Sequence, residues 1–285
     1  MGVSAEAEAR EPGCVTCGRV AAFGLDFPGR VGLGAGYDRS GERLAELEGA
    51  GFAFVELGTA TPEPLAGHNP GVEALASAVM RYRARRAPGR SRPLIGVSLG
   101  RQPQHRLCDA GRDFEIGMQC AWACADYLAI NLSGPAAQPL HAPDRGGELL
   151  AALEDVRVQQ ERRAASTARR VPVLVKYPVF PGSRLDRIRA LRFDGLIAVF
   201  ADGSERSYVY AAQPDVARVM QALAPSTALV AGSGIRDAAD AVGYLNAGAR
   251  LVQLHRAYVE QGAALVHRIN RELASAAGNA AALSS

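Results

Sequence analysis

The stretch LVAGSGIRDAADAV, from Leu229 to Val242, joins a short apolar run to a glycine-rich turn and an alanine-rich segment. The run Ala228–Ala231 has the character of a buried strand, Gly232-Ser233-Gly234 forms the turn, and a helix is predicted to begin near Asp237. Strand, turn and helix in this order make one βα unit, from which parallel sheets are built. The fold class therefore depends on how often this unit recurs.

The same alternation runs through most of the chain, in eight short apolar runs separated by longer amphipathic segments. The predicted strands are Val31–Ala35, Phe54–Gly58, Leu94–Leu99, Tyr127–Leu132, Val171–Lys176, Gly195–Phe200, Ala228–Ala231 and Arg250–Leu254. The predicted helices include Gly41–Ala50, Phe114–Ala123, Gly146–Ala168, Leu185–Leu191, Asp215–Leu223, Ala238–Ala247 and Gly262–Ala274. Eight such units predict a single (β/α)8 TIM barrel, with the chemistry in the loops that follow the strands. An open doubly wound sheet is the alternative, but the turn GLGAGYD lacks the G-x-G-x-x-G spacing typical of that fold.

Composition limits the classes of function. The chain has 285 residues, is 48% hydrophobic and carries a net charge of +3, so we expect a large core and no nucleic-acid partner. Five cysteines, an odd number, and a start without a basic-then-apolar leader favour a cytoplasmic location. No apolar run approaches the ~20 residues of a membrane helix, so no membrane partner is expected. Residues 1–22 are polar and aperiodic and predict a loosely ordered extension, followed by the barrel over residues 23–285.

Lys176 is the only lysine in the chain, in which the Lys+Arg count is 32. It ends the predicted fifth strand, in RVPVLVKYP, so in a barrel it is expected at the mouth. A Lys kept where Arg is the rule favours a site that needs a compact charge on a thin stem, although chance survival of one codon explains it equally well. Further polar residues follow the strands: Asp38, Arg39, Thr59, Thr61, Ser98, Asn131, Ser133, Asp202 and Ser204. Loop polarity and helix capping explain any one of them, but together they predict a polar ring.

The turn Gly232-Ser233-Gly234 predicts a phosphate site. Glycines let backbone N–H groups approach an anion, and the start of the next helix adds positive dipole. The eighth strand ends in His255-Arg256, and a guanidinium suits phosphate oxygens. These elements follow strands seven and eight, where such barrels usually bind phosphate. A plain glycine-rich turn is the alternative.

Three other motifs predict no site. Cys14-x-x-Cys17 lacks a second Cys/His pair, so no metal site is predicted. Cys120 and Cys124 lie four residues apart on a predicted helix and are expected in the core. The basic run RYRARRAPGRSR, residues 81–92, is interpreted as a solvated helix end, because it lacks interleaved aromatic residues.

Six stretches carry a resemblance to a known family: FGLDFPGRVGLGAGYDRSGE, GFAFVELGTATPEP, ADYLAINLSGP, VPVLVKY, FDGLIA and GSGIRDAADAVGYLNAGARLVQLHRAYVEQGAALVHRINREL. From Phe23 to Ala274 the chain resembles the dihydroorotate dehydrogenases, most of all their membrane-associated, quinone-using class. The resemblance implies an FMN-dependent (β/α)8 barrel that is a monomer or a homodimer. It implies flavin contacts at Ala35, Gly36, Gly58, Thr59, Asn131, Lys176 and the turn Gly232 to Gly234. In the family, the lysine equivalent to Lys176 lies beside the pyrimidine edge of the flavin, where negative charge develops on reduction.

The departures from the family fall mainly on the substrate. The family's catalytic base is a serine at the position of Gly134, with Ser133 one residue away. The orotate-binding loop after the second strand is shortened, with Asn69 as a remnant, and the polar segment after the sixth strand reads Val199-Phe200-Ala201-Asp202. Substitutions also occur at flavin positions: Ser98 for Asn, Ser233 for Gly, and His255-Arg256 for Tyr-Thr. Only about 22 polar residues precede the barrel, where the quinone-using class has amphipathic helices, so a quinone partner is not expected.

Our leading hypothesis is an FMN-binding oxidoreductase derived from dihydroorotate dehydrogenase that acts on another small-molecule substrate, in a specialised biosynthetic pathway. Lys176, Asn131 and Ser133 are the predicted catalytic residues. The candidates for proton transfer are His105, His141, Ser133, Asp202, Tyr177 and Cys108. Two alternatives stay open: a flavin-free lyase or isomerase that uses Lys176 as a Schiff-base nucleophile, and a non-catalytic binding homologue.

Overall fold

Eight parallel strands close into a barrel in the computed structural model, which describes residues 18–85, 92–180, 183–200, 216–224 and 227–282. The barrel strands are β3 (Val31–Leu33), β4 (Phe54–Ala60), β5 (Leu94–Leu99), β6 (Tyr127–Asn131), β7 (Val173–Val179), β8 (Gly195–Phe200), β9 (Leu229–Ala231) and β10 (Leu251–Leu254). They pair in chain order, and β10 closes the barrel against β3. The predicted single (β/α)8 barrel is confirmed.

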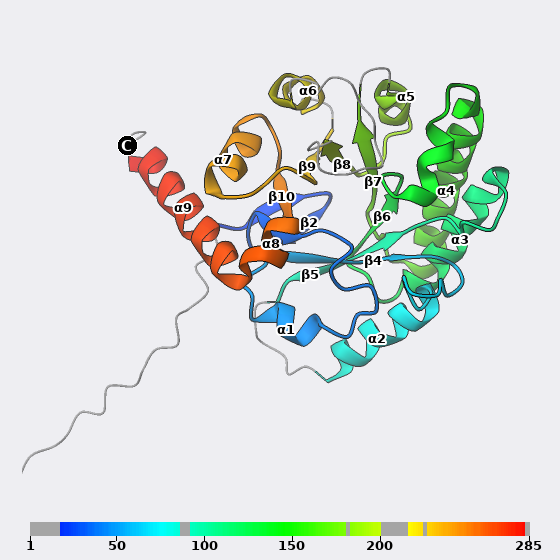
Figure 1. Ribbon diagram of the computed structural model, residues 1–285, viewed down its shortest axis with the longest axis horizontal. Coiled ribbons are helices and arrows are strands. Elements are labelled where there is room, and N and C mark those ends of the chain that lie inside the picture. Colours follow the sequence, from blue (N-terminus) through cyan, green and yellow to red (C-terminus); the bar gives the residue numbers. More distant parts are fainter. Residues whose placement is uncertain (1–17, 86–91, 181–182, 201–215, 225–226, 283–285) are drawn as a thin grey trace, which may run out of the picture.

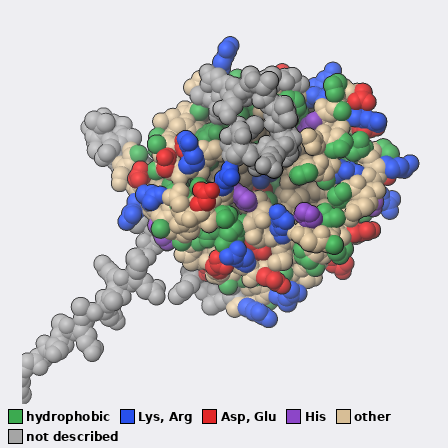
Figure 2. All heavy atoms as spheres, in the orientation of Figure 1, with side chains coloured by type: hydrophobic (Ala, Val, Ile, Leu, Met, Phe, Trp, Pro, Cys, Tyr) green, Lys and Arg blue, Asp and Glu red, His purple; other side chains and the backbone are tan. Residues whose placement is uncertain are grey.

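Helices surround the barrel on the outside (Figure 1). They are α1 (Leu44–Glu48), α2 (Val72–Ala84), α3 (Ala110–Ala121), α4 (Gly146–Thr167), α5 (Leu185–Ala190), α6 (Val216–Leu223), α7 (Ala238–Asn246), α8 (Arg256–Gln261) and α9 (Ala263–Ala282). Short 3-10 helices occupy Leu107–Asp109, Pro135–His141 and Pro143–Arg145, all in loops that follow β5 and β6. Charged side chains of both signs are interspersed on the face shown in Figure 2.

Strand alternation sorts the apolar residues into two layers. Val55 and Leu57 of β4 point outward into the layer between strands and helices, whereas Phe54 points into the barrel. Inside, two glycines make room for large rings. A Cβ on Gly32 would lie 2.3 Å from the Phe54 ring, and one on Gly96 would lie 2.2 Å from the Tyr127 ring. The lower half of the barrel is therefore a packed apolar core.

A short hairpin closes the bottom of the barrel. Its strands β1 (Val20–Ala22) and β2 (Leu25–Phe27) pair antiparallel. Val20 is 6% exposed, and Phe27 packs edge-on against Phe54 inside the barrel. The predicted end of the loose extension at residue 22 falls inside this hairpin, so residues 20–22 belong to the ordered structure. This hairpin could not be predicted, because strands of three residues are too short to show periodicity.

Strand boundaries agree with the prediction at β5 and β8, where both ends coincide. The largest difference concerns the predicted strand Val171–Lys176. The observed β7 begins at Val173 and continues to Val179, through Pro178. Lys176 therefore lies in the middle of a strand, and not at its end as predicted.

The remaining sequence motifs have ordinary surroundings. The thiol of Cys124 is buried, and burial raises its pKa to about 11. In the basic run, Arg83 pairs with Asp126 at 2.8 Å. Cys14 and Cys17 lie outside the described residues. Within the described ranges, no group of three or more metal-ligating side chains gathers, and none of the helices is both long and apolar enough to cross a bilayer.

Candidate functional site

The mouth of the barrel begins where glycine backbones of neighbouring strands approach each other. The N–H of Gly36, after β3, donates to the carbonyl of Gly58 in β4 at 2.7 Å. Both residues have positive φ, 116° and 103°, a region that disfavours side chains. A Cβ on Gly58 would also lie 2.7 Å from the Ser98 carbonyl oxygen. Glycine is therefore required at these predicted cofactor positions, with Ala35 beside them.

Four of the predicted site residues form one hydrogen-bonded cluster. The Asn131 Nδ2 donates to Thr59 Oγ1 at 2.6 Å, and the Thr59 and Ser98 hydroxyls lie 3.2 Å apart. Ser133 donates to Asn131 Oδ1 through its backbone N–H at 2.9 Å and its hydroxyl at 2.8 Å. The amide of Asn131 is thus held in one orientation. Ser133 acts here as a positioning residue, with its hydroxyl proton directed at Asn131.

Lys176, which lies opposite Asn131 in the pairing of β6 with β7, forms a buried ion pair. Its Nζ is 3.1 Å from Glu56 Oε1, and the two residues are 7% and 1% exposed. The prediction that Lys176 ends its strand is wrong, since β7 continues to Val179, and the negative charge beside its ammonium is a carboxylate of the protein. The reason is the alternation of β4, which turns Glu56 inward two residues after Phe54.

Two further buried side chains hold the other oxygen of Glu56. The Gln253 Nε2 donates to Glu56 Oε2 at 2.9 Å, and the Tyr127 hydroxyl donates to it at 3.4 Å. Burial, reinforced by the charge of Glu56, raises the pKa of Tyr127 well above its usual value. We call Glu56, Tyr127, Lys176 and Gln253 the interior polar layer.

The sequence analysis missed three members of the interior polar layer, namely Glu56, Tyr127 and Gln253. A signal for two of them was present. Glu56 in FVELGTA and Gln253 in LVQL each interrupt a strand that is otherwise apolar, at an inward-facing position. A polar residue in such a strand either meets a partner or lines a site.

The residues of the predicted phosphate site do not all point to one place: Ser233 binds the backbone of β8, and Arg256 lies on the exposed surface of α8. The Ser233 hydroxyl accepts from the Phe200 N–H at 2.7 Å and donates to the Phe200 carbonyl at 2.8 Å, so it fastens β8 to the turn after β9. Arg256 lies in α8, with its side chain 65% exposed and 3.4 Å from Glu260. The N–H groups of Ser233 and Gly234 have no hydrogen-bond partner among the described residues. Among the described residues, the groups that remain available to bind an anion here are therefore the backbone N–H groups of Ser233 and Gly234, next to Gly232.

His255, which was predicted to contact the phosphate, lies over a glycine at the mouth. Its Nε2 lies 2.8 Å from where a Cβ on Gly36 would be, so the imidazole covers the glycine at the mouth. His255 is exposed at the rim of the barrel mouth. Partial desolvation lowers the pKa of His255, and the positive charges of Lys176 and Arg39 lower it further. The imidazole is therefore more often neutral than a free histidine at the same pH.

Two of the candidates for proton transfer, His141 and Tyr177, are held in structural contacts, and a third, Cys108, is exposed. The His141 Nε2 lies 2.7 Å from the Leu132 carbonyl oxygen, and burial lowers the pKa of its ring. Tyr177 is fully buried in the outer apolar layer, where burial raises its pKa and its hydroxyl accepts from the Arg184 N–H. Cys108 is exposed and its thiol contacts Asp109. Asp202 lies outside the described residues.

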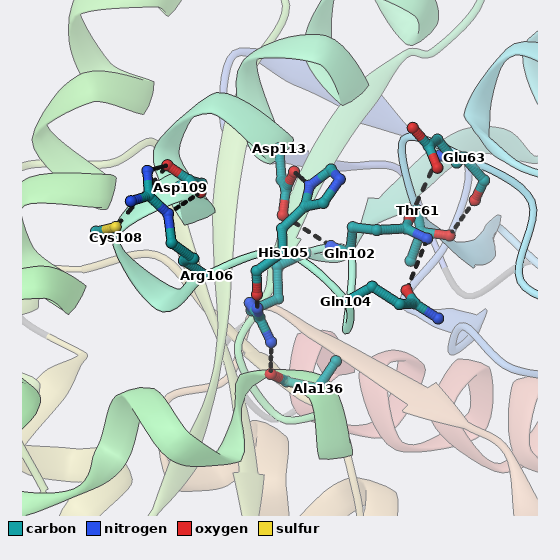
Figure 3. A network of polar contacts seen from close by, with 11 residues as sticks. Thr61, Glu63, Gln102, Gln104, His105, Arg106, Cys108, Asp109, Asp113 and Ala136 are labelled. Carbon is teal, nitrogen blue, oxygen red and sulfur yellow. Dashed lines mark hydrogen bonds and ion pairs between the residues drawn. The ribbon is translucent and has the colours of Figure 1, made fainter.

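His105 has the geometry of an acid–base group (Figure 3). Its Nδ1 is 2.7 Å from Asp113 Oδ1, and the Asp113 side chain is 1% exposed. Asp113 also accepts from the Gln102 N–H at 2.8 Å, which fixes the carboxylate. A buried carboxylate on Nδ1 orients the imidazole and leaves Nε2 for exchange of a proton.

The loops after β4, β5 and β6 are joined into one wall (Figure 3). The Glu63 N–H donates to Gln102 Oε1 at 3.3 Å, which links the first two loops. The Arg101 guanidinium donates to the carbonyl oxygens of His105 and of Ala136, the latter at 2.8 Å. The loop of His105 therefore lies beside the segment that begins at Gly134.

These residues fit the ring system of FMN better than its phosphate. On the ring side, Gly36 and Gly58 offer their backbone, and Lys176 offers a cation. Gln253 Oε1 is a buried acceptor that has no hydrogen-bond partner among the described residues. On the phosphate side, the described residues offer backbone N–H groups and the exposed Arg256. The donor and acceptor set is therefore compatible with a flavin ring, which Asn131, Thr59 and Lys176 would contact.

Comparisons with known proteins agree with the fold. No protein-family model matches the chain. The chain is 33% identical over 288 aligned residues to a dihydroorotate dehydrogenase (quinone) of Flavobacterium lutescens, covering 86% of this chain and 81% of the relative. A relative of the same name from Stenotrophomonas maltophilia is 32% identical, with 86% and 80% covered.

Among solved structures, a dihydroorotate dehydrogenase of Eimeria tenella in complex with ferulenol superposes with a TM-score of 0.73 at 22% identity, covering 98% of this chain and 88% of that chain. The ligand-free form from the same organism gives a TM-score of 0.74 at 21% identity, with 98% and 91% covered. At this level of identity the superposition establishes the barrel architecture only.

Proposed function

Because the chain belongs to the dihydroorotate dehydrogenase family, a family of oxidoreductases, we propose that it is an FMN-dependent oxidoreductase whose small substrate is not dihydroorotate. The proposal rests on one contrast. The positions expected to contact the flavin ring are retained or conservatively replaced, whereas the position of the catalytic base, Gly134, has no side chain.

Gly134 faces the site, so its lack of a side chain matters. A Cβ at Gly134 would lie 3.5 Å from Asn131 Nδ2. The backbone there is extended, with φ −80° and ψ 160°, which any residue adopts. A serine hydroxyl would therefore fit beside Asn131, and its absence is a chemical difference and not a steric necessity.

His105 is the group that we propose for proton transfer in place of that serine. Its Nε2 would exchange the proton while Asp113 holds Nδ1. Arg101 keeps the loop of His105 beside the segment that begins at Gly134, through the Ala136 carbonyl. This contact supports the proposal, because it holds the backbone of the His105 loop close to the segment that follows Gly134.

FMN, when bound, supplies the acceptor or donor of the electron pair. Asn131, fixed by Thr59 and Ser133, would orient the ring or the substrate through its remaining N–H. Lys176 would contribute positive charge from below, reduced in effect by Glu56. The fixed Asn131 amide and the buried Lys176 cation favour a preorganised site over one that rearranges when the ligand binds.

The absorption spectrum of the freshly purified chain tests the proposal. We expect the spectrum of a bound flavin, or its appearance on reconstitution with FMN, and we expect added dihydroorotate not to bleach it. A colourless chain that does not bind FMN would refute flavin dependence, and borohydride trapping of a carbonyl compound on Lys176 would then support the lyase or isomerase alternative. Rapid bleaching by dihydroorotate would refute the change of substrate.

A further inference from the structure

The 3-10 helix η2 (Pro135–His141) is part of the wall that the loops after β4, β5 and β6 form at the barrel mouth. Its first residues follow Gly134 directly, and the Ala137 N–H donates to the Gly134 carbonyl at 3.0 Å. Its last residue, His141, contacts the end of β6, with Nε2 2.7 Å from the Leu132 carbonyl oxygen. Leu140 is fully buried in the outer apolar layer. The helix is thus packed onto the barrel and fastened at its end by a histidine.

The ring of His141 is enclosed by two aromatic rings at the end of β7. It lies edge-on to Tyr177, with the ring centroids 5.2 Å apart, and edge-on to Phe180 at 6.0 Å. A carbonyl oxygen only accepts, so Nε2 carries a proton and donates it to Leu132. Nδ1 is buried and has no hydrogen-bond partner within the described residues. The enclosure therefore fits a neutral imidazole with a single proton.

A second proton on this ring would meet neither an acceptor nor a negative charge. It would create a buried Nδ1–H without a partner, which is unfavourable. The Arg184 guanidinium donates to the backbone carbonyls of residues 141–143, at 2.9 to 3.3 Å, and so adds a fixed positive charge nearby. Tyr177, the other titratable group that faces the ring, stays neutral because burial raises its pKa. In the part of the chain that the structure describes, no carboxylate binds the ring.

The pKa of His141 follows from these surroundings. Desolvation lowers it, the contact with the Leu132 carbonyl offsets part of this, and the charge of Arg184 lowers it further. Once η2 has moved away from the barrel, the ring is solvated and takes up a proton near the usual value of about 6.5. The packed form of η2 is therefore fully favoured above that pH, and it loses this advantage as the pH falls below it.

We propose that η2 is a pH-sensitive latch on the wall of the barrel mouth: a second proton, taken from solvent, moves the His141 ring out from between Tyr177 and Phe180, and the end of η2 detaches from β6. Arg101 joins the Ala136 carbonyl to the loop of His105, so opening of η2 loosens both parts of the wall. The proposal goes beyond the proposed function, because the latch operates whatever ligand the mouth binds.

Hydrogen exchange of backbone amides tests the latch on the full chain, without added flavin, at pH 7.5 and 5.5. The N–H groups of Ala137 and Ala142 report on η2, since they bind the carbonyls of Gly134 and Pro139, and the N–H of Leu128 reports on the barrel. After correction for the intrinsic effect of pH on exchange, we expect opening of η2 to increase about tenfold at the lower pH. Protection at Leu128 should stay the same.

Two variants assign the effect to one histidine. His141→Gln keeps a donor for the Leu132 carbonyl but does not titrate, so we expect it to lose the response to acid. His267→Gln removes an exposed histidine of α9 and should respond as the wild-type chain does. An unchanged exchange rate of η2 in the wild-type chain, or a response that persists in His141→Gln, would overturn the latch. If His141→Gln does not fold, the ring resonances of His141 in the wild-type chain decide: a midpoint shared with the amides of η2 supports the latch, and separate midpoints overturn it.

Discussion

The two sides of the barrel mouth differ in how their polar groups are held. On the side of β4, β5 and β6, the side chains of Thr59, Ser98 and Asn131 bind one another. On the side of β9 and β10, Ser233 binds the backbone of Phe200, and Arg256 extends along the exposed surface of α8. The first side is preorganised for a ligand, whereas the second offers backbone N–H groups. We call the first the ring side and the second the anion side of the mouth.

The interior polar layer below the ring side should give the largest effect. Glu56→Leu leaves the Lys176 ammonium buried without a counter-charge, which is expected to cost about 3–5 kcal/mol of unfolding free energy. The double variant Glu56→Leu/Lys176→Leu removes both charges and is expected to recover most of that loss. Urea denaturation of the three chains measures it. A double variant as unstable as Glu56→Leu would show that the charge pair is not the source of the effect.

The next largest effect on stability should come from acidification, through His141, whose ring contacts the Leu132 carbonyl after β6. Burial lowers the pKa of His141 in the folded chain, so the unfolded chain takes up the proton first, near its usual value of about 6.5. Stability is therefore complete above that pH and falls as the pH drops through it. The Nδ1 of His141 is buried and has no partner within the described ranges, so protonation would also leave an N–H without an acceptor there.

A comparison of His141→Gln with the wild-type chain checks this assignment, by urea midpoints between pH 7.5 and 5. We expect the variant to be less stable at the upper pH and to lose less on acidification. Parallel loss in both chains would place the pH dependence elsewhere, for example at His255, whose pKa is also lowered, mainly by desolvation.

The two serines sharpen the contrast between the sides of the mouth. Ser133→Ala and Ser233→Ala each remove a hydroxyl that makes hydrogen bonds, so each is expected to cost about 1 kcal/mol of unfolding free energy. Only Ser133→Ala removes one of the three hydrogen bonds that hold the Asn131 amide, so only this variant is expected to weaken FMN binding. Equal loss of FMN affinity in both variants would contradict the division of the mouth into two differently held sides.

The sequence predicted the barrel because its information is local and repeated. Eight apolar runs with the right spacing are enough to predict the barrel, and both ends of β5 and β8 were predicted correctly. The interior polar layer was missed because it depends on which residues of different strands share a height inside the barrel. Lys176 and Glu56 are 120 positions apart in the chain, and no local pattern links them. The hairpin of β1 and β2 was missed for a related reason, since its burial comes entirely from the barrel that it closes.

Arg256 should give the smallest effect, and it tests how much of the anion side survives. Its pair with Glu260 joins two exposed side chains, so Arg256→Ala should change the unfolding free energy by less than about 1 kcal/mol. If its guanidinium contributes only weakly to phosphate binding, the affinity for FMN should fall by no more than about threefold, while that for riboflavin, which lacks the phosphate, stays the same. Titrating both flavins against the wild-type chain and the variant measures this. A far larger loss confined to FMN would mean that Arg256 leaves Glu260 for the phosphate, and that the anion side assembles around its ligand although it is not preorganised.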